Sequence, residues 1–158
     1  MPGNQRSMGR DHAVGHPALT DPQTGLANGL HFELVYSYLF EAGDRGIAFA
    51  VMLISVGEAP PERLRTLGEI VHNTTRTADL VAHVGGGRYV VLLFGSNLPG
   101  ARIAADRLET ALRDKSPGPL SFGIAAYHPE LKTSADLLEA ADTALLKAEA
   151  SGGGVEMA

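Results

Sequence analysis

The stretch RTADLVAHVGGGRYVVLLF, residues 76–94, carries the clearest structural pattern in this sequence. Two apolar runs, 79–84 and 89–94, lie on either side of three consecutive glycines at positions 85–87. Apolar runs that flank a glycine turn are typical of a β-hairpin, because glycine adopts the left-handed backbone conformations that tight turns require. We therefore predict a pair of antiparallel strands joined at the glycines.

Three more strands are predicted outside the hairpin. The run GIAFAVMLISV ends at Val56 and is almost continuously apolar, which is typical of a central strand buried on both faces. LSFGIAAY at 120–127 follows a Pro-Gly-Pro turn and predicts a fourth strand. Val155 follows three glycines and is expected to begin a short last strand.

Four helices are predicted between these strands, at residues 30–41, 62–75, 100–113 and 135–150. The inward faces expected from spacing include Leu34, Tyr38 and Leu39 in the first helix and Ile103, Ala104, Leu108 and Leu112 in the third. Ser134 is the expected N-cap of the last helix. Hairpin strands mixed with crossover helices predict the α+β class, as a mixed-sheet sandwich.

Length and composition suit one compact domain. We expect a flexible leader at 1–17, rich in Gly, Pro and polar residues, and a single domain at 18–158. With 13 Lys and Arg against 18 Asp and Glu, the net charge is −5, so a general nucleic-acid binder is not expected. A small anion held by two or three local arginines remains compatible with this charge.

The sequence has no cysteine, which excludes disulfides and thiol chemistry. No stretch approaches the roughly 20 apolar residues that a membrane span needs, and the first residues contain no apolar core of a signal peptide. We therefore expect a cytoplasmic domain without a membrane partner. His12 and His16 are four residues apart, but Gly15 and Pro17 disfavour a helix there, so we expect no metal site at this pair.

Four stretches together resemble the GGDEF (diguanylate cyclase) domain family. DPQTGLANGLHF (21–32) resembles its entry motif DxLTGLxNRRxF, and residues 76–93 resemble RxxDxxxRxGGDEFxxLL. LSFGIAAY (120–127) resembles its SiGvA strand, and AADTALLKAEASGGG (140–154) resembles ADxALYxAKxxGRN. They occur in the family's order. The resemblance implies a mainly antiparallel sheet of about five strands with helices on both faces.

The resemblance also implies that the catalytic residues of the family are missing. A diguanylate cyclase holds a divalent metal with carboxylates, but the strand position is Ser55 and the hairpin positions are Gly87 and Arg88. The family's phosphate-binding Lys aligns with Glu149 and the Arg of GRN with Gly153. The guanine-reading segment that follows the first central strand is also absent. We expect no cyclase activity, no bound metal and no cofactor.

One functional motif of the family is retained. Arg76 and Asp79 occupy the positions of the RxxD site that binds cyclic di-GMP, and Arg107 matches an arginine that completes it. Arginine can donate two hydrogen bonds to guanine or to phosphate, and a carboxylate can accept from guanine. The alternative is a plain surface ion pair in a scaffold that binds a protein partner or forms a homodimer. His72 and His83 are expected to be surface or partly packed histidines.

Overall fold

A computed structural model describes residues 16–158. The first fifteen residues of the predicted leader lie outside the described residues, and Pro17 begins a short 3-10 helix. Along the chain the elements are η1 (Pro17–Leu19), α2 (Gly29–Gly43), β1 (Phe49–Ser55), α3 (Pro61–Thr74), β2 (Leu80–His83), β3 (Arg88–Phe94), α4 (Leu98–Leu112), β4 (Ser121–Ala126), α5 (Ser134–Ala150) and β5 (Gly154–Met157).

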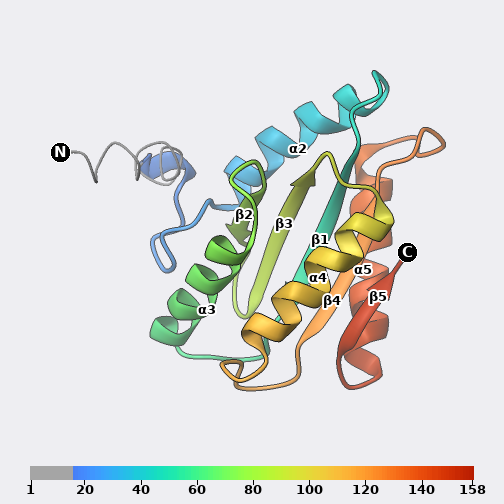
Figure 1. Cartoon of the computed structure of the whole chain (residues 1–158). Helices are drawn as coiled ribbons and strands as arrows, with labels where there is room; N and C mark the ends of the chain where they lie inside the picture. The colour runs from blue at the N-terminus through green and yellow to red at the C-terminus, as the bar shows by residue number, and fades with distance from the viewer. Residues whose placement is uncertain (1–15) are drawn as a thin grey trace.

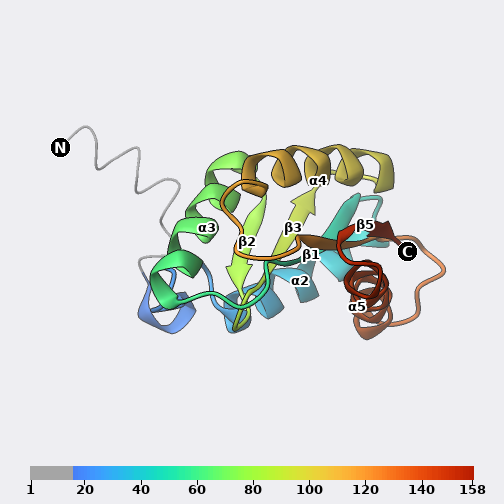
Figure 2. The same ribbon diagram turned by 90° about the horizontal axis from the view of Figure 1, so that it is seen from below.

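The five strands form one sheet in the order β2-β3-β1-β4-β5 (Figure 1). All neighbouring strands are antiparallel except β4 and β5, which are parallel. Seen from below, α3 and α4 cover one face of the sheet, and α2 and α5 cover the other (Figure 2). The predicted α+β class and the mainly antiparallel five-stranded sheet are confirmed.

The central strand β1 supplies both halves of the core. Its side chains alternate between the two faces, as in any strand. Ala50, Met52 and Ile54 belong to the cluster under α3 and α4, while Phe49 and Val51 belong to the cluster under α2 and α5. All five are at most 1% exposed. This double burial explains why the strand reads as a continuous apolar run rather than as an alternating pattern.

The predicted inward face of α2 was wrong for two residues. Leu34 is 57% exposed and Tyr38 is 76% exposed, whereas Leu39 is buried as predicted. The helix instead buries Phe32, Tyr36, Leu39 and Phe40. Because apolar residues lie almost all the way round this helix, spacing alone could not identify the side that faces the sheet.

Two details of α4 and α5 also differ from the prediction. Ile103 of α4 is 61% exposed instead of facing the core. The N-cap of α5 is Thr133, and Ser134 is the first helical residue. Thr133 and Asp136 form a reciprocal capping box, which gives two backbone N–H groups at the helix start a partner.

No helix among residues 16–158 combines the length and the apolar character that crossing a bilayer would require.

Helix α5 packs unusually close to β4 because Gly123 has no side chain. A Cβ atom at this position would lie 2.3 Å from the backbone nitrogen of Leu145 and 2.4 Å from the carbonyl oxygen of Ala141. Both are backbone atoms of α5, so no side-chain rotation could relieve the overlap. The glycine therefore sets the distance between this helix and the sheet.

We predict that Gly123→Ala lowers the free energy of unfolding by about 1–3 kcal/mol, because the added methyl group forces α5 away from β4. Urea denaturation followed by circular dichroism measures this change. The matched control is Gly29→Ala, where a Cβ would meet nothing within 4 Å at the start of α2. A Gly123→Ala protein as stable as this control would contradict the close contact.

Candidate functional site

Arg76 and Asp79 form a two-point ion pair in the turn between α3 and β2. The Arg76 Nη2 atom lies 3.0 Å from Asp79 Oδ1, and Nε lies 3.3 Å from Oδ2. The backbone N–H of Arg76 also donates to Asp79 Oδ2, at 3.1 Å. The hydrogen bond and the charge of Asp79 raise the pKa of the Arg76 guanidinium. Because the two residues are three positions apart, both the backbone and the side chain of Arg76 can donate to the Asp79 carboxylate.

The same guanidinium reaches the end of the neighbouring strand β3. Arg76 Nη2 donates to the carbonyl oxygen of Phe94 at 2.6 Å and to Ser96 Oγ at 3.2 Å. These contacts fix the orientation of the arginine, although its side chain stays 55% exposed. The Asp79 side chain is only 2% exposed, because Arg76 covers it. The arginine is therefore the member of the pair that faces solvent.

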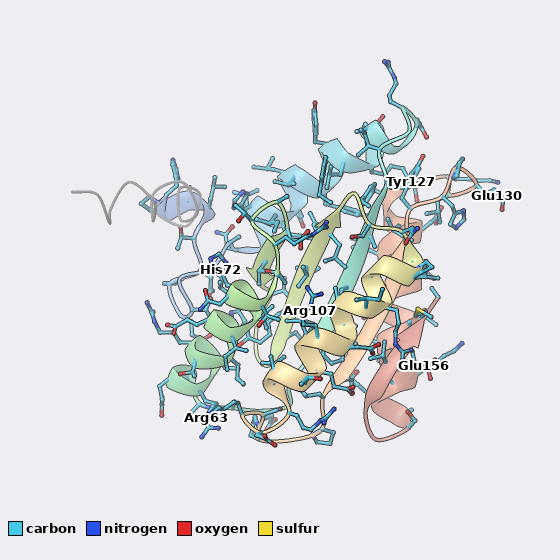
Figure 3. All side chains as sticks on the ribbon, viewed as in Figure 1. Arg63, His72, Arg107, Tyr127, Glu130 and Glu156 are labelled. Carbon is cyan, nitrogen blue, oxygen red and sulfur yellow. The ribbon has the colours of Figure 1, made fainter. Side chains whose placement is uncertain are left out.

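Arg76, Asp79 and Arg107 line one pocket of about 360 Å³, which we call the α4 pocket. Arg107 comes from α4 (Figure 3). Ile103 of the same helix and Ser96 of the preceding loop contribute to the walls. The structure thus brings the three predicted residues together. Sequence reasoning missed Ser96 and Ile103, because only the fold places the start of α4 beside the α3–β2 turn.

The electrostatics of the α4 pocket favour an anion. Two arginines face one carboxylate that is already paired, and Arg107 makes no ion pair with any residue of the described chain. The first turn of α4 also borders the pocket at Asn97 and Gly100, where Asn97 caps the helix by accepting from the Gly100 N–H at 2.9 Å. The positive end of a helix dipole adds to the field of the arginines.

The predicted catalytic positions lie together at the other end of the sheet. Ser55 is the last residue of β1, and its cross-strand partners are Arg88 on β3 and Ser121 on β4. Ser55 is buried, at 9% exposure. The positions expected for metal ligands therefore converge in space, but they offer a hydroxyl group and a guanidinium.

Arg88 is held by two acidic residues of α5. Its Nη2 lies 3.2 Å from Glu149 Oε1, and its Nη1 lies 3.6 Å from Asp142 Oδ1. Arg88 thus stands where the family resemblance expects an acid, and Glu149 where it expects a lysine. The two charges are reversed together, so the contact between the hairpin and α5 remains attractive.

The connection after β1 closes against the hairpin tip. The N–H of Val56 donates to the carbonyl oxygen of Gly87 at 2.8 Å. A Cβ atom at Gly87 would lie 1.9 Å from the carbonyl oxygen of Gly57, so no side chain fits there unless the loop moves. The short link from Val56 into α3 therefore packs directly on the position that carries an acid in the family pattern.

These residues do not fit a magnesium ion, which prefers carboxylate and other oxygen ligands. Ser55, Gly87 and Arg88 supply no carboxylate, and the guanidinium of Arg88 would repel the cation. Within residues 16–158, no three or more His, Cys, Asp or Glu side chains gather in an arrangement that could hold a metal.

Residues 61–154 match the family described as diguanylate cyclase, GGDEF domain. The match spans more than half of the 158 residues and covers both the α4 pocket and the hairpin end. The chain belongs to the GGDEF domain family.

Known relatives agree with this assignment. Diguanylate cyclase A of Treponema denticola is 27% identical over 97 residues, which is 56% of this chain and 26% of the relative. The matched region therefore spans about a quarter of that curated protein. The solved GGDEF domain of YfiN, also called TpbB, from Pseudomonas aeruginosa is 28% identical, with a TM-score of 0.75 over 87% of this chain and 93% of that one.

A more distant GGDEF structure shares the fold. The coiled coil and GGDEF domain of DgcB from Caulobacter crescentus, solved in complex with c-di-GMP, has a TM-score of 0.76 at 18% identity. The alignment covers 99% of this chain and 94% of DgcB. At this identity the likeness establishes the fold alone.

The structure corrects the prediction for His83, which occupies the position of an arginine in the GGDEF pattern. His83 is buried at 3% exposure. Its Nδ1 lies 3.0 Å from Asp21 Oδ2, and its Nε2 lies 2.7 Å from the carbonyl oxygen of Gly86. The Thr24 hydroxyl donates to the same Asp21 oxygen at 2.7 Å. His83 therefore ties the entry motif of the GGDEF domain to the hairpin turn, across 62 residues that local patterns cannot bridge.

Gly87→Asp restores the acid of the family pattern. We predict that it lowers the free energy of unfolding by about 1–3 kcal/mol, because the new side chain overlaps Gly57. The control Arg88→Glu loses only exposed ion pairs and places like charges together, so its cost is expected below about 1 kcal/mol. Urea denaturation compares the two. Equal stability of Gly87→Asp and the unmodified domain would show that the loop yields freely.

Proposed function

We propose that this GGDEF domain is catalytically inactive and binds cyclic di-GMP through Arg76, Asp79 and Arg107. The observation that carries the proposal is the convergence of these three side chains on the α4 pocket. They come from two elements separated in sequence, the α3–β2 turn and α4. An RxxD sequence that had arisen by chance would give no reason for a second arginine, from another helix, to line the same pocket.

Each arginine has a distinct part in the proposed complex. Arg76 is oriented by Asp79 and by the end of β3, so less of its conformational entropy is lost on binding. It can donate to the O6 and N7 atoms of guanine, or to phosphate. Arg107 has no ion-pair partner among the described residues and can neutralise a phosphate of the ligand.

Asp79 acts in this proposal mainly by positioning Arg76. Both carboxylate oxygens already accept hydrogen bonds from Arg76, and only 2% of the side chain is exposed. A direct bond from Asp79 to guanine N1–H or N2–H requires the arginine to turn aside first. The ligand can therefore bind to the presented guanidinium without breaking the pair.

Relatives support the choice of ligand. The GGDEF domain of DgcB was solved with c-di-GMP, and the curated relative of this chain is a diguanylate cyclase. A domain of this family therefore operates where cyclic di-GMP is made and read. The ligand carries two negative phosphates, which matches the excess of arginine in the α4 pocket.

The chemistry at the hairpin end supports inactivity. Joining two GTP molecules requires a metal to neutralise charge at the phosphate under attack. Ser55 and Arg88 cannot hold that metal, and Glu149 would repel a triphosphate where the family pattern has a lysine. Because Arg88 is paired with Glu149 and Asp142, the reversed charges stabilise one another instead of a substrate.

A scaffold that binds a protein is the second candidate, and the surface of α2 favours it. Leu30, Leu34 and Tyr38 are spaced by one helical turn and are 50%, 57% and 76% exposed. Such an apolar stripe is suited to a protein partner or a second copy of the domain. This function predicts association that does not depend on cyclic di-GMP.

We predict that calorimetric titration of cyclic di-GMP into the domain gives micromolar or tighter binding, and that Arg76→Ala weakens it at least about a hundredfold, since a charge-assisted bidentate contact contributes roughly 3 kcal/mol. Arg107→Ala should weaken it about tenfold. The control is Arg102→Ala on the same helix, where the arginine pairs with Asp106 and lies outside the α4 pocket. No binding by the unmodified domain, or equal binding by Arg76→Ala, would refute the receptor function.

A separate prediction concerns catalysis. The domain incubated with GTP and Mg²⁺ is expected to form no cyclic di-GMP, because Ser55, Gly87 and Arg88 carry no carboxylate at the positions that hold the metal in the family pattern. Chromatography of the nucleotides measures the product, with an active diguanylate cyclase assayed in parallel. Product formation above the rate of a protein-free reaction would contradict the inactive assignment.

A further inference from the structure

A second pocket lies on the other side of the Arg76–Asp79 pair. It has a volume of about 270 Å³ and is lined by Ala27, by His31 and Val35 of α2, by His72 near the end of α3, and by residues 76–81, which form the α3–β2 turn and the start of β2. We call it the α2 pocket. Helices α2 and α4 cover opposite faces of the sheet (Figure 2), and the α2 pocket draws on α2 where the α4 pocket draws on α4. Arg76 and Asp79 line both pockets.

His31 gives the α2 pocket a polar group without a partner. Its Nδ1 is the one buried side-chain nitrogen or oxygen atom of residues 16–158 that makes no hydrogen bond. Leaving such an atom unpaired destabilises the folded state, so a folded protein seldom keeps one without a reason. Burial lowers the pKa of His31, and the neutral ring therefore offers one donor and one acceptor.

His31 lines the α2 pocket, and its ring can turn without any backbone movement. A half-turn of the imidazole about its Cβ–Cγ bond exchanges Nδ1 with Cδ2, and this side-chain torsion is broad and soft. A ligand in the α2 pocket can therefore recruit either ring nitrogen of His31.

The sizes of the two pockets indicate how a dinucleotide is divided between them. Small-molecule sites usually measure roughly 300–1,000 Å³, so the α2 and α4 pockets are each at the small end of this range. Each suits one nucleobase with its sugar better than a whole cyclic dinucleotide. A cyclic dinucleotide has two bases joined through a phosphate ring, which matches two small pockets that share a cationic wall.

We propose that the α2 pocket receives the second guanine of cyclic di-GMP, and that His31 recognises its edge. The first guanine then occupies the α4 pocket, and the phosphate ring passes over Arg76 between them. Val35 and Leu80 supply apolar walls for the faces of the base. Through one ring nitrogen at a time, His31 can donate to guanine O6 or N7 or accept from guanine N1–H. This inference rests on the proposed function and adds a binding subsite to it.

The test compares the dinucleotide with a single nucleotide. His31→Ala removes the polar contact, and Ala78→Leu fills the α2 pocket from an exposed position of the turn. Both should weaken cyclic di-GMP binding about tenfold in calorimetry, which corresponds to about 1.4 kcal/mol. The control Leu34→Ala, on the solvent face of α2 and outside both pockets, should bind as the unmodified domain does.

Amide chemical shifts then locate each base. Adding cyclic di-GMP should shift the amides of His31 and Val35 in the α2 pocket and of Gly100 in the α4 pocket. Adding GMP, which has one base, should shift only Gly100. No shift at His31 and Val35 on adding cyclic di-GMP, while Gly100 shifts, overturns the subsite.

The possible failures are distinct. No binding of cyclic di-GMP by the unmodified domain refutes the proposed function itself. Tight binding that His31→Ala and Ala78→Leu leave unchanged overturns the subsite alone and leaves the receptor function standing. Ala78→Leu deletes no contact, so it keeps the test valid if His31→Ala fails to fold by circular dichroism.

Discussion

The antiparallel register between β1 and β3 is the constraint on which the other features depend. It pairs Phe49 with Phe94 at one end and Ser55 with Arg88 at the other. Because side chains alternate along a strand, a slip of one residue would turn every buried side chain of β1 to the opposite helix layer. The register is therefore fixed by the burial of both faces of β1. It also determines which residues lie side by side at each end of the sheet.

The two ends of this register have different roles. The α4 and α2 pockets border the end at Phe94, whereas the reversed charges of Arg88 and Glu149 lie at the end of Ser55. Seven residues of β1 separate them, which is roughly 20 Å at the rise of an extended strand. Substitutions at the hairpin turn therefore do not touch the residues that line the α4 and α2 pockets. The proposed function requires this separation, because it lets the hairpin end change while the residues of the α4 pocket stay the same.

Patterns in the sequence predicted the parts of the fold that are set locally. The apolar runs gave the strands, and the hairpin glycines gave the turn between β2 and β3. The exposed face of α2 could not be predicted, because Leu34 and Tyr38 are as apolar as the buried residues beside them. In the site, the RxxD spacing is local and was recognisable.

Contacts between distant residues could not be predicted in the same way. His83 and Asp21 are 62 positions apart, and Arg88 and Glu149 are 61 positions apart. In each pair, the sequence around one residue does not predict contact with the other. The α2 pocket was also out of reach, since it depends on where α2 docks beside the α3–β2 turn. The decisive measurement is the structure of the domain in complex with cyclic di-GMP. We expect the ligand beside Arg76 and Arg107, with no nucleotide at the hairpin. A nucleotide bound with Mg²⁺ at Ser55 and Arg88, and none beside Arg76, would contradict it.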